Sequence, residues 1–264
     1  MFDYHTHTEF SSDALSPMAT MAEAALRAGL EGIAFTEHME WMPADGAFGY
    51  LKPRTYFAEL EALRARYNGS LKLLAGIEAG NPHCFPDVAH AMLTDWPWDI
   101  VLGSMHWVND RPGWELPAFE NGVEAAYTRY FEELARMAVE SEYDVLAHFD
   151  IVRRDSWSLL RRVLPLDDYA EQVRQILRSV VARGKGLEIN VSSWRKGMPD
   201  PLPGLTVLRW YRELGGEILV VGSDAHQPEH VGEYFDRACG LAVQAGFTRL
   251  ARFERRRVVG WTAL

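Results

Sequence analysis

Seven short apolar runs recur along this chain of 264 residues, and a segment with helical spacing of its apolar residues follows each run. We interpret the runs as strands, which span Phe2–His5, Gly32–Thr36, Leu71–Glu78, Asp99–Ser104, Asp144–Ala147, Gly186–Asn190 and Glu217–Val221. Regular alternation of strands and helices implies parallel strands joined by right-handed crossovers. Nearly continuous apolar strands imply burial on both faces, so the pattern predicts an α/β fold.

The predicted helices span Pro17–Ala28, Thr55–Tyr67, Pro86–Thr94, Val123–Ser141, Leu166–Arg183, Leu205–Leu214 and Val231–Ala245. Ser16, Pro17 and Gly29 are suited to the N-cap, the first position and the end of the first helix. A basic tail, Arg252 with Arg255–Arg257, follows the last helix. No linker of changed composition divides the chain, so we predict a single domain over residues 1–264.

Six of the nine histidines, and two carboxylates, stand where the predicted strands end. These candidate ligands are His5, His7, His38, Glu78, His106, His148, Asp224 and His226. Ligand-type residues follow nearly every strand rather than one switch point, which favours a closed or nearly closed barrel over an open sheet. Strand tips converge on one face of a barrel, so the pattern predicts a metal centre. A site rich in nitrogen and oxygen ligands accepts Zn, Fe, Mn or Co.

Some of these residues have a second interpretation. His5 and His7 are two residues apart in an extended segment, so both imidazoles can chelate one ion. Each histidine taken alone could equally be a part-buried core residue. Glu78 could bridge metals or pair with an arginine at the barrel rim. Asp13 could join the site or serve as a turn or cap residue in the segment Ser11–Asp13.

Clustered divalent cations make hydroxide available at neutral pH and neutralise charge on the group attacked, so the constellation is typical of hydrolases. A phosphate ester would also need arginine, because the guanidinium matches phosphate oxygens in a bidentate manner. Arg153 and Arg154 follow the His148 strand, and Arg195 follows the Asn190 strand. All three are candidate phosphate contacts, although loop arginines are also commonly just solvated.

Composition limits the partners. A formal net charge of −10 argues against binding to nucleic acid, whose partners usually carry a basic surface. Cys84 and Cys239 fit neither a disulfide framework nor a metal-binding pair, as expected in a reducing cytoplasm. We see no signal peptide, and no apolar run approaches the roughly 20 residues that span a bilayer. We expect a cytoplasmic protein without membrane contact, as a monomer or a small homo-oligomer.

With these residues in view, the chain resembles the polymerase and histidinol phosphatase (PHP) superfamily, and most closely its histidinol-phosphatase branch. The similarity covers nearly the whole chain. The matching motifs are Asp3–Asp13, Phe35–His38, Gly76–Glu78, Gly103–His106 and Gly222–His226. Together and in this order, the motifs are specific.

The resemblance implies a distorted (β/α)7 TIM-like barrel that binds two or three divalent transition-metal ions. The implied ligand sets are His5, His7, Glu78 and Asp224 for one ion, Glu78, His106 and His148 for the second, and Asp13, His38 and His226 for the third. Position 13 departs from family members that have histidine there, and an aspartate offers an oxygen ligand instead. The resemblance also implies attack on phosphorus by a metal-bridging hydroxide. Glu78 would bridge the metals, and Asp224 or His226 would assist proton transfer to the leaving alkoxide.

The same resemblance suggests Arg153 or Arg154, together with Arg195, as phosphate contacts. A PHP module of a DNA polymerase would lie in a far larger chain, so we expect a small-molecule enzyme that hydrolyses L-histidinol phosphate to L-histidinol and phosphate in histidine biosynthesis. One alternative is a PHP phosphoesterase acting on a nucleotide or a cyclic phosphate, and another is a non-catalytic metal-binding protein. An amino-imidazole substrate should prefer a carboxylate for its ammonium, with Glu40 or Glu115 as candidates, whereas a nucleotide should need aromatic stacking.

Overall fold

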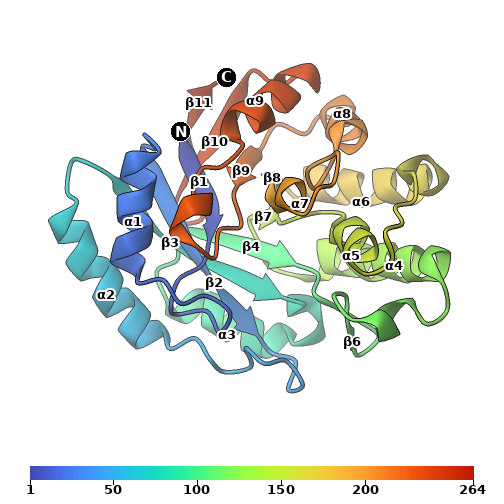
Figure 1. The fold of residues 1–264 in the computed structure, drawn as a ribbon, viewed down its shortest axis with the longest axis horizontal. Coiled ribbons are helices and arrows are strands. Elements are labelled where there is room, and N and C mark those ends of the chain that lie inside the picture. The colour runs from blue at the N-terminus through green and yellow to red at the C-terminus, as the bar shows by residue number, and fades with distance from the viewer.

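Seven parallel strands form a nearly closed barrel at the centre of the computed structural model, which describes residues 1–264 (Figure 1). Their order is β1-β2-β3-β4-β7-β8-β9, and they span Phe2–Thr6, Gly32–Glu40, Lys72–Gly80, Ile100–Ser104, Val145–Leu146, Gly186–Asn190 and Leu219–Gly222. The chain after the last strand lies beside the end of the first strand and nearly closes the barrel. There the N–H of His7 donates to the carbonyl of Ala225, and the N–H of Asp224 donates to the carbonyl of His5. The predicted α/β barrel, a distorted (β/α)7 TIM-like barrel, is confirmed.

Nine helices surround the strands, and Figure 1 shows them around the outside of the barrel. Helices α1 to α9 span Met18–Arg27, Pro53–Arg66, Pro86–Asp95, Val123–Glu140, Ile151–Leu160, Ala170–Ala182, Ser192–Arg195, Leu205–Glu213 and Phe235–Gln244. Four single 3₁₀ turns, η1 to η4, span Pro82–Cys84, Leu116–Phe119, Leu166–Tyr169 and Pro228–His230. The long helices form where apolar residues recur every three or four positions. In α6 these residues are Val173, Ile176, Leu177 and Val180, and all four are fully buried.

Two apolar regions stabilise the barrel. The larger region lies between the strands and the surrounding helices and comprises 64 buried residues. The smaller region gathers Phe2 and Tyr4 of β1, Ala34 of β2 and Leu74 of β3 with residues of β4, β7 and β9. These strand residues fill the barrel interior at one end, which leaves the other end free for polar side chains.

The tail after α9 is an antiparallel hairpin, not the simple basic tail that we expected. Its strands are β10, Arg249–Glu254, and β11, Arg257–Ala263. Phe253 of β10 joins the interior apolar region, and its N–H donates to the hydroxyl of Tyr4 at 2.9 Å. The hairpin therefore helps to close the end of the barrel opposite the polar side chains, beside the N-terminal strand (Figure 1).

Several predicted boundaries were wrong. Strand β2 continues to Glu40 instead of ending at Thr36, so His38 lies within the strand. Helix α5 was not predicted at all. The last helix begins at Phe235 rather than Val231. A small hairpin of β5, Trp107–Val108, and β6, Arg111–Pro112, lies in the loop that follows β4.

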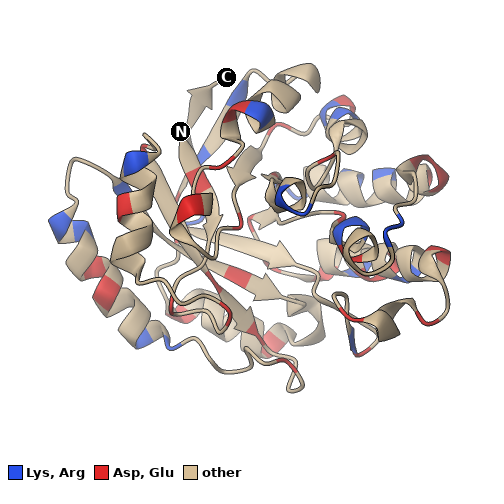
Figure 2. Cartoon of the chain, in the orientation of Figure 1, with Lys and Arg blue, Asp and Glu red and all other residues tan.

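Charged residues of both signs are interspersed along the helices, as Figure 2 shows for α2. The helices carry no continuous stripe of lysine and arginine in that view. None of the helices combines the length and the apolar character that crossing a membrane requires.

Candidate metal centre

The strands deliver polar side chains to one mouth of the barrel because residues two apart in a strand point to the same side. Ala34 of β2 belongs to the interior apolar region, and His38 and Glu40 follow it at even spacing. Leu74 and Glu78 of β3 show the same relation. Strands β2 and β3 are thus apolar at their beginning and ligand-bearing at their end.

Glu78 lies at the centre of the site and contacts several of the imidazoles. Its Oε1 lies 2.7 Å from Nε2 of His148 and 3.1 Å from Nε2 of His106, and its Oε2 lies 2.9 Å from Nδ1 of His38. The Ser104 hydroxyl also donates to Oε1 at 2.8 Å. No arginine contacts this carboxylate, so the alternative of a rim pair with arginine is wrong.

Asp224 is the second buried carboxylate, and it links both ends of the chain. Its Oδ1 lies 3.5 Å from Nε2 of His7, 3.8 Å from Nε2 of His5 and 3.7 Å from Nδ1 of His226. The Nε2 atoms of His5 and His7 also lie 3.4 and 3.5 Å from Oε2 of Glu78. The two histidines of the first motif therefore stand between two carboxylates.

Four ligand-type atoms in this cluster are buried without a hydrogen bond of good geometry, although each lies 2.9 to 3.5 Å from another ligand atom. They are Nε2 of His5, Nε2 of His7, Nδ1 of His38 and Oε2 of Glu78, and Oε2 of Glu40 and Nδ1 of His148 lack a hydrogen bond as well. An unsatisfied buried polar atom is costly, and native proteins rarely leave several together. Divalent cations would satisfy all four atoms, so the residues fit the metal ions that the sequence predicts.

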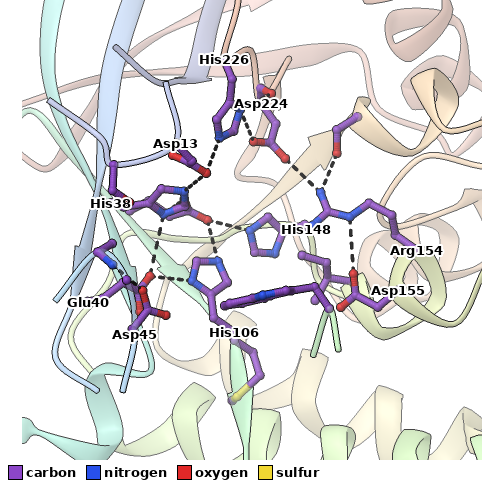
Figure 3. Close-up of a pocket in the computed structure, with 18 of the residues that line it drawn as sticks. Asp13, His38, Glu40, Asp45, His106, His148, Arg154, Asp155, Asp224 and His226 are labelled. Atoms are coloured by element: carbon purple, nitrogen blue, oxygen red, sulfur yellow. Dashed lines mark hydrogen bonds and ion pairs between the residues drawn. The ribbon is translucent and has the colours of Figure 1, made fainter. Parts of the chain in front are cut away.

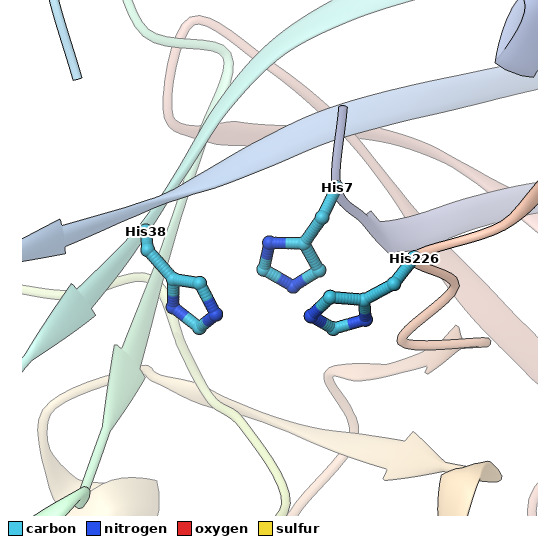
Figure 4. A group of neighbouring side chains, drawn as sticks. All are labelled: His7, His38 and His226. Carbon is cyan, nitrogen blue, oxygen red and sulfur yellow. The ribbon is translucent and has the colours of Figure 1, made fainter. Parts of the chain in front are cut away.

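Four overlapping groups have ligand atoms within 4.8 Å of one another: His7 with His38 and His226, His5 with Glu78 and His148, His5 with His7 and Asp224, and His38 with Glu40 and His106. Figure 4 shows the three rings of the first group turned toward one another. Every strand-end ligand predicted from the sequence thus lies in one cluster.

Asp13 also lies at the cluster, at its exposed edge. Its Oδ2 lies 3.1 Å from Nε2 of His226 and 3.4 Å from Nε2 of His38. Although partial burial opposes ionisation, hydrogen bonds to His226 and His38 hold the pKa of Asp13 below its ordinary value. Asp13 is therefore an ionised oxygen ligand candidate beside two imidazoles.

Electrostatics act differently on the individual ligands. Although burial opposes protonation, the buried carboxylates raise the pKa of His5, His38 and His106, so a cation would have to displace a proton from these rings. Glu78 and His7 are already in forms that can bind a cation. Burial opposes ionisation of Glu78, but the imidazoles of His38 and His5 hold its pKa well below the ordinary value. Burial, together with His226 and His38, lowers the pKa of His7 to about 3. At neutral pH Glu78 is therefore a carboxylate, and the ring of His7 is neutral with a free lone pair.

A cavity of about 540 Å³ opens over the cluster (Figure 3). Asp13, Glu40 and Asp45 contribute acidic side chains from the segments of β1 and β2 and the loops that follow them. Basic side chains come from the segments after β7 and β8, and they are Arg154, Arg195 and Lys196. The cavity can therefore receive a small molecule that carries both an anionic and a cationic group.

The structure separates the two adjacent arginines. Arg154 lines the cavity, and its Nη1 donates to Oγ of Ser192 at 3.0 Å and to Oδ2 of Asp224 at 3.2 Å. Arg153 does not line it, because its guanidinium forms ion pairs with Asp150 and Asp200. Arg195 lines the cavity as well, and its Nη2 donates to the carbonyl of Asp224 at 2.8 Å.

Several polar groups near the cluster were not predicted from the sequence. Glu188 of β8 and Glu40 of β2 lie behind the imidazoles of His5 and His106, with Oε1 2.7 Å and 2.6 Å from Nδ1 of those rings. Glu40 was considered only for a substrate ammonium, and Glu115 does not line the cavity. The even spacing of Thr36, His38 and Glu40 is a signal that could have revealed Glu40.

The sequence and the structure of this chain were compared with those of known proteins. The family model of the PHP domain matches residues 3–192. A probable histidinol-phosphatase of Deinococcus radiodurans is 29% identical over 240 residues, which cover 88% of this chain and 89% of that protein. A histidinol-phosphatase of Lactococcus lactis is 26% identical over 255 residues, which cover 96% and 94%. The crystal structure of histidinol phosphate phosphatase from Lactococcus lactis, complexed with Zn, L-histidinol and phosphate, matches with a TM-score of 0.89 at 25% identity, over 98% of both chains.

Proposed function

Because the chain belongs to the PHP domain family, we propose that it is a metal-dependent phosphomonoesterase that hydrolyses L-histidinol phosphate to L-histidinol and phosphate. One observation supports the proposal above all: six imidazoles and two buried carboxylates lie together at one mouth of the barrel, and several of their ligand atoms are buried without a hydrogen bond. The match to a phosphatase structure that contains Zn, L-histidinol and phosphate supports the choice of substrate. In this proposal residues 1–264 form one PHP phosphoesterase domain.

We infer that two or three divalent ions, of Zn, Fe, Mn or Co, occupy the cluster. The proposed ligand sets are His5, His7, Glu78 and Asp224 for one ion, Glu78, His106 and His148 for the second, and Asp13, His38 and His226 for the third. The unsatisfied atoms of His5, His7 and Glu78 support the first set. The third set is supported by Nε2 of His38, which lies 3.4 Å from Oδ2 of Asp13. A third ion would gain an oxygen ligand from Asp13, a residue type that hard cations accept.

Bound divalent cations would supply a nucleophilic water of lowered pKa and would neutralise charge on the phosphate. The residues of the chain do the remaining work. Asp224 and His226 both line the cavity, with Nδ1 of His226 3.7 Å from Oδ1 of Asp224. Either group is placed to assist proton transfer to the leaving alkoxide of the alcohol, His226 as a proton donor and the ionised Asp224 by accepting a proton and passing it on.

We assign the phosphate contacts to Arg154 and Arg195 rather than to Arg153. Arg154 keeps its Nη2 free of hydrogen bonds while Nη1 is held by Ser192 and Asp224, so the guanidinium is fixed and still has donors for a ligand. A guanidinium fixed beside the metal ligands can bind phosphate oxygens in the geometry that favours transfer. The guanidinium of Arg153 instead forms ion pairs with Asp150 and Asp200.

The cationic part of the substrate has carboxylates available on the cavity wall. Glu40 is already bound to His106, so Asp45 and Asp155 are the candidates for the ammonium or imidazolium group. Asp45 also accepts the indole N–H of Trp107, and Oδ1 of Asp155 lies 3.7 Å from Nε of Arg154. Figure 3 shows Asp45 near Glu40, and Asp155 beside Arg154 on the other side of the cavity. Acidic groups near a basic phosphate site suit L-histidinol phosphate better than a nucleotide, whose base carries no positive charge.

The test is to purify the protein without added metal, measure its bound metals, and compare phosphate release from L-histidinol phosphate, other phosphomonoesters, nucleotides and cyclic phosphates. We expect bound transition metal, the highest kcat/KM for L-histidinol phosphate, and loss of turnover on chelation that the metal restores. Preference for a nucleotide or cyclic phosphate would contradict the substrate. Metal binding without chelator-sensitive turnover would contradict an enzymatic role.

A further inference from the structure

A buried carboxylate lies directly behind the metal-binding edge of the candidate centre. Glu188 of β8 is fully buried and does not line the cavity, so it cannot reach a substrate. No lysine or arginine lies within ion-pair distance of it, and its one ion-pair partner is His5. A buried carboxylate without a cationic side chain is costly unless other groups compensate its charge.

Both oxygens of Glu188 accept hydrogen bonds from groups of the centre. Oε1 lies 2.7 Å from Nδ1 of His5. Oε2 accepts the backbone N–H of His148 at 2.7 Å and the side-chain amide of Asn190 at 3.2 Å. The same amide nitrogen lies 3.3 Å from Oδ2 of Asp224, so Glu188 connects to three of the proposed ligands.

We propose that Glu188 is a positioning residue that fixes His5 in the tautomer whose Nε2 lone pair faces the cation, and that also holds the backbone of His148. An ionised carboxylate can only accept a hydrogen bond, so Nδ1 of His5 must carry the proton. Nε2 of His5 is then the nitrogen that gives up its proton when a cation binds, and it is the buried atom that has no hydrogen-bond partner in the protein. The inference rests on the proposed metal-dependent function.

The backbone of His148 supports the second half of the proposal. His148 has φ of +27°, a conformation that a residue with a side chain adopts only when its surroundings enforce it. The short hydrogen bond from its N–H to Glu188 is one such constraint. His5 and His148 belong to the same ligand group with Glu78, so one carboxylate orients two of its three members.

Gly222 of β9 provides the space for this carboxylate. A Cβ at position 222 would collide with Oε1 of Glu188 and with Cβ of His5. Since φ of Gly222 is not in the left-handed region, the backbone itself would allow alanine there. The glycine is therefore required for the close approach of Glu188 to His5 rather than for a turn.

Glu188→Gln tests the proposal because it preserves shape and changes one acceptor into a donor. The N–H of His148 and the amide of Asn190 should keep the glutamine oxygen at the Oε2 position, so the glutamine NH₂ would face Nδ1 of His5. This arrangement favours the opposite tautomer, in which Nε2 carries the proton and cannot bind a cation. We expect the affinity for one cation to fall about 10- to 100-fold.

The measurement is titration of the chelator-treated full chain with Co²⁺, followed by its visible absorption bands, with Zn²⁺ affinity from competition against a chromophoric chelator. Long-range ¹H–¹⁵N correlation of the histidine rings reports the tautomer of His5 with Zn²⁺ bound. Asp144→Asn is the matched control, because Asp144 accepts the N–H of Val101 and an ion pair from Arg256 without contacting a proposed ligand. The control should keep wild-type metal affinity.

Gly222→Ala provides a second variant that changes no polar group, and it should weaken the same cation by displacing Glu188. The proposal is overturned if either folded variant binds Co²⁺ within threefold of wild type with an unchanged spectrum, or if wild-type His5 carries its proton on Nε2. If the wild-type chain itself bound no transition metal, the proposed function would fail instead. The two failures are therefore distinguishable.

Discussion

Replacing Arg154 by alanine should lower kcat/KM for L-histidinol phosphate by about 10²- to 10³-fold. The side chain is 17% exposed, and Ser192 and Asp224 hold its guanidinium at the cavity wall beside the proposed metal ligands. Removing one fixed donor from a group that develops charge in the transition state typically costs about 2.7–4 kcal/mol, which corresponds to that factor. Arg154→Lys keeps the charge but loses the fork geometry, so we expect an intermediate rate.

The matched control is Arg153→Ala, which removes the neighbouring guanidinium from outside the cavity. That variant should lower stability through loss of its ion pairs with Asp150 and Asp200, while its kcat/KM at a temperature where it is folded stays within a few-fold of wild type. The assay is steady-state phosphate release from the metal-loaded enzymes. A larger loss in Arg153→Ala than in Arg154→Ala would refute the assignment of the phosphate contact.

Three further predictions concern the ligands and the fold. His148→Ala and Glu78→Ala should each abolish phosphate release while the circular dichroism spectrum stays that of a folded barrel, and near-normal turnover in either would contradict the assigned roles. Burial lowers the pKa of His83 in the folded chain. Below about pH 6.5 the unfolded chain therefore binds a proton at this histidine that the folded chain does not bind, so acidification should lower the free energy of unfolding by up to about 1.4 kcal/mol per pH unit. Urea denaturation at several pH values should show this extra slope against His83→Asn, and equal slopes would exclude it. Ile176→Ala should lower the free energy of unfolding by about 2–5 kcal/mol in the same assay, because the side chain is fully buried in α6, and a loss below 1 kcal/mol would contradict the packing.

The barrel and the position of the strand-end ligands were predictable because each depends on local patterns. Alternating apolar runs define the strands, and parallel strands bring their ends together whatever lies between them. The polar partners behind the ligands were not predictable in the same way. Glu188 is visible as one acidic residue in an apolar run, but its partner His5 lies 183 positions away in the chain.

Helix α5 and the C-terminal hairpin were missed for local reasons. The α5 segment carries Arg153, Arg154 and Asp155 in succession, which hides the apolar spacing of a helix. The turn between β10 and β11 has positive φ at Arg255 and Arg256, where glycine or asparagine usually signals a hairpin. Asp99 stabilises this turn by accepting the N–H groups of both arginines, at 3.0 and 2.8 Å, and such a tertiary contact leaves no trace in the local sequence.

The most direct test of the central claim is an anomalous-difference map from crystals of the full chain grown with Zn²⁺, recorded on both sides of the zinc absorption edge. We expect at least two peaks among His5, His7, Glu78, His148 and Asp224, at coordination distances of about 2.0–2.2 Å. A map without peaks at this mouth, or with zinc bound only elsewhere on the surface, would contradict the central claim.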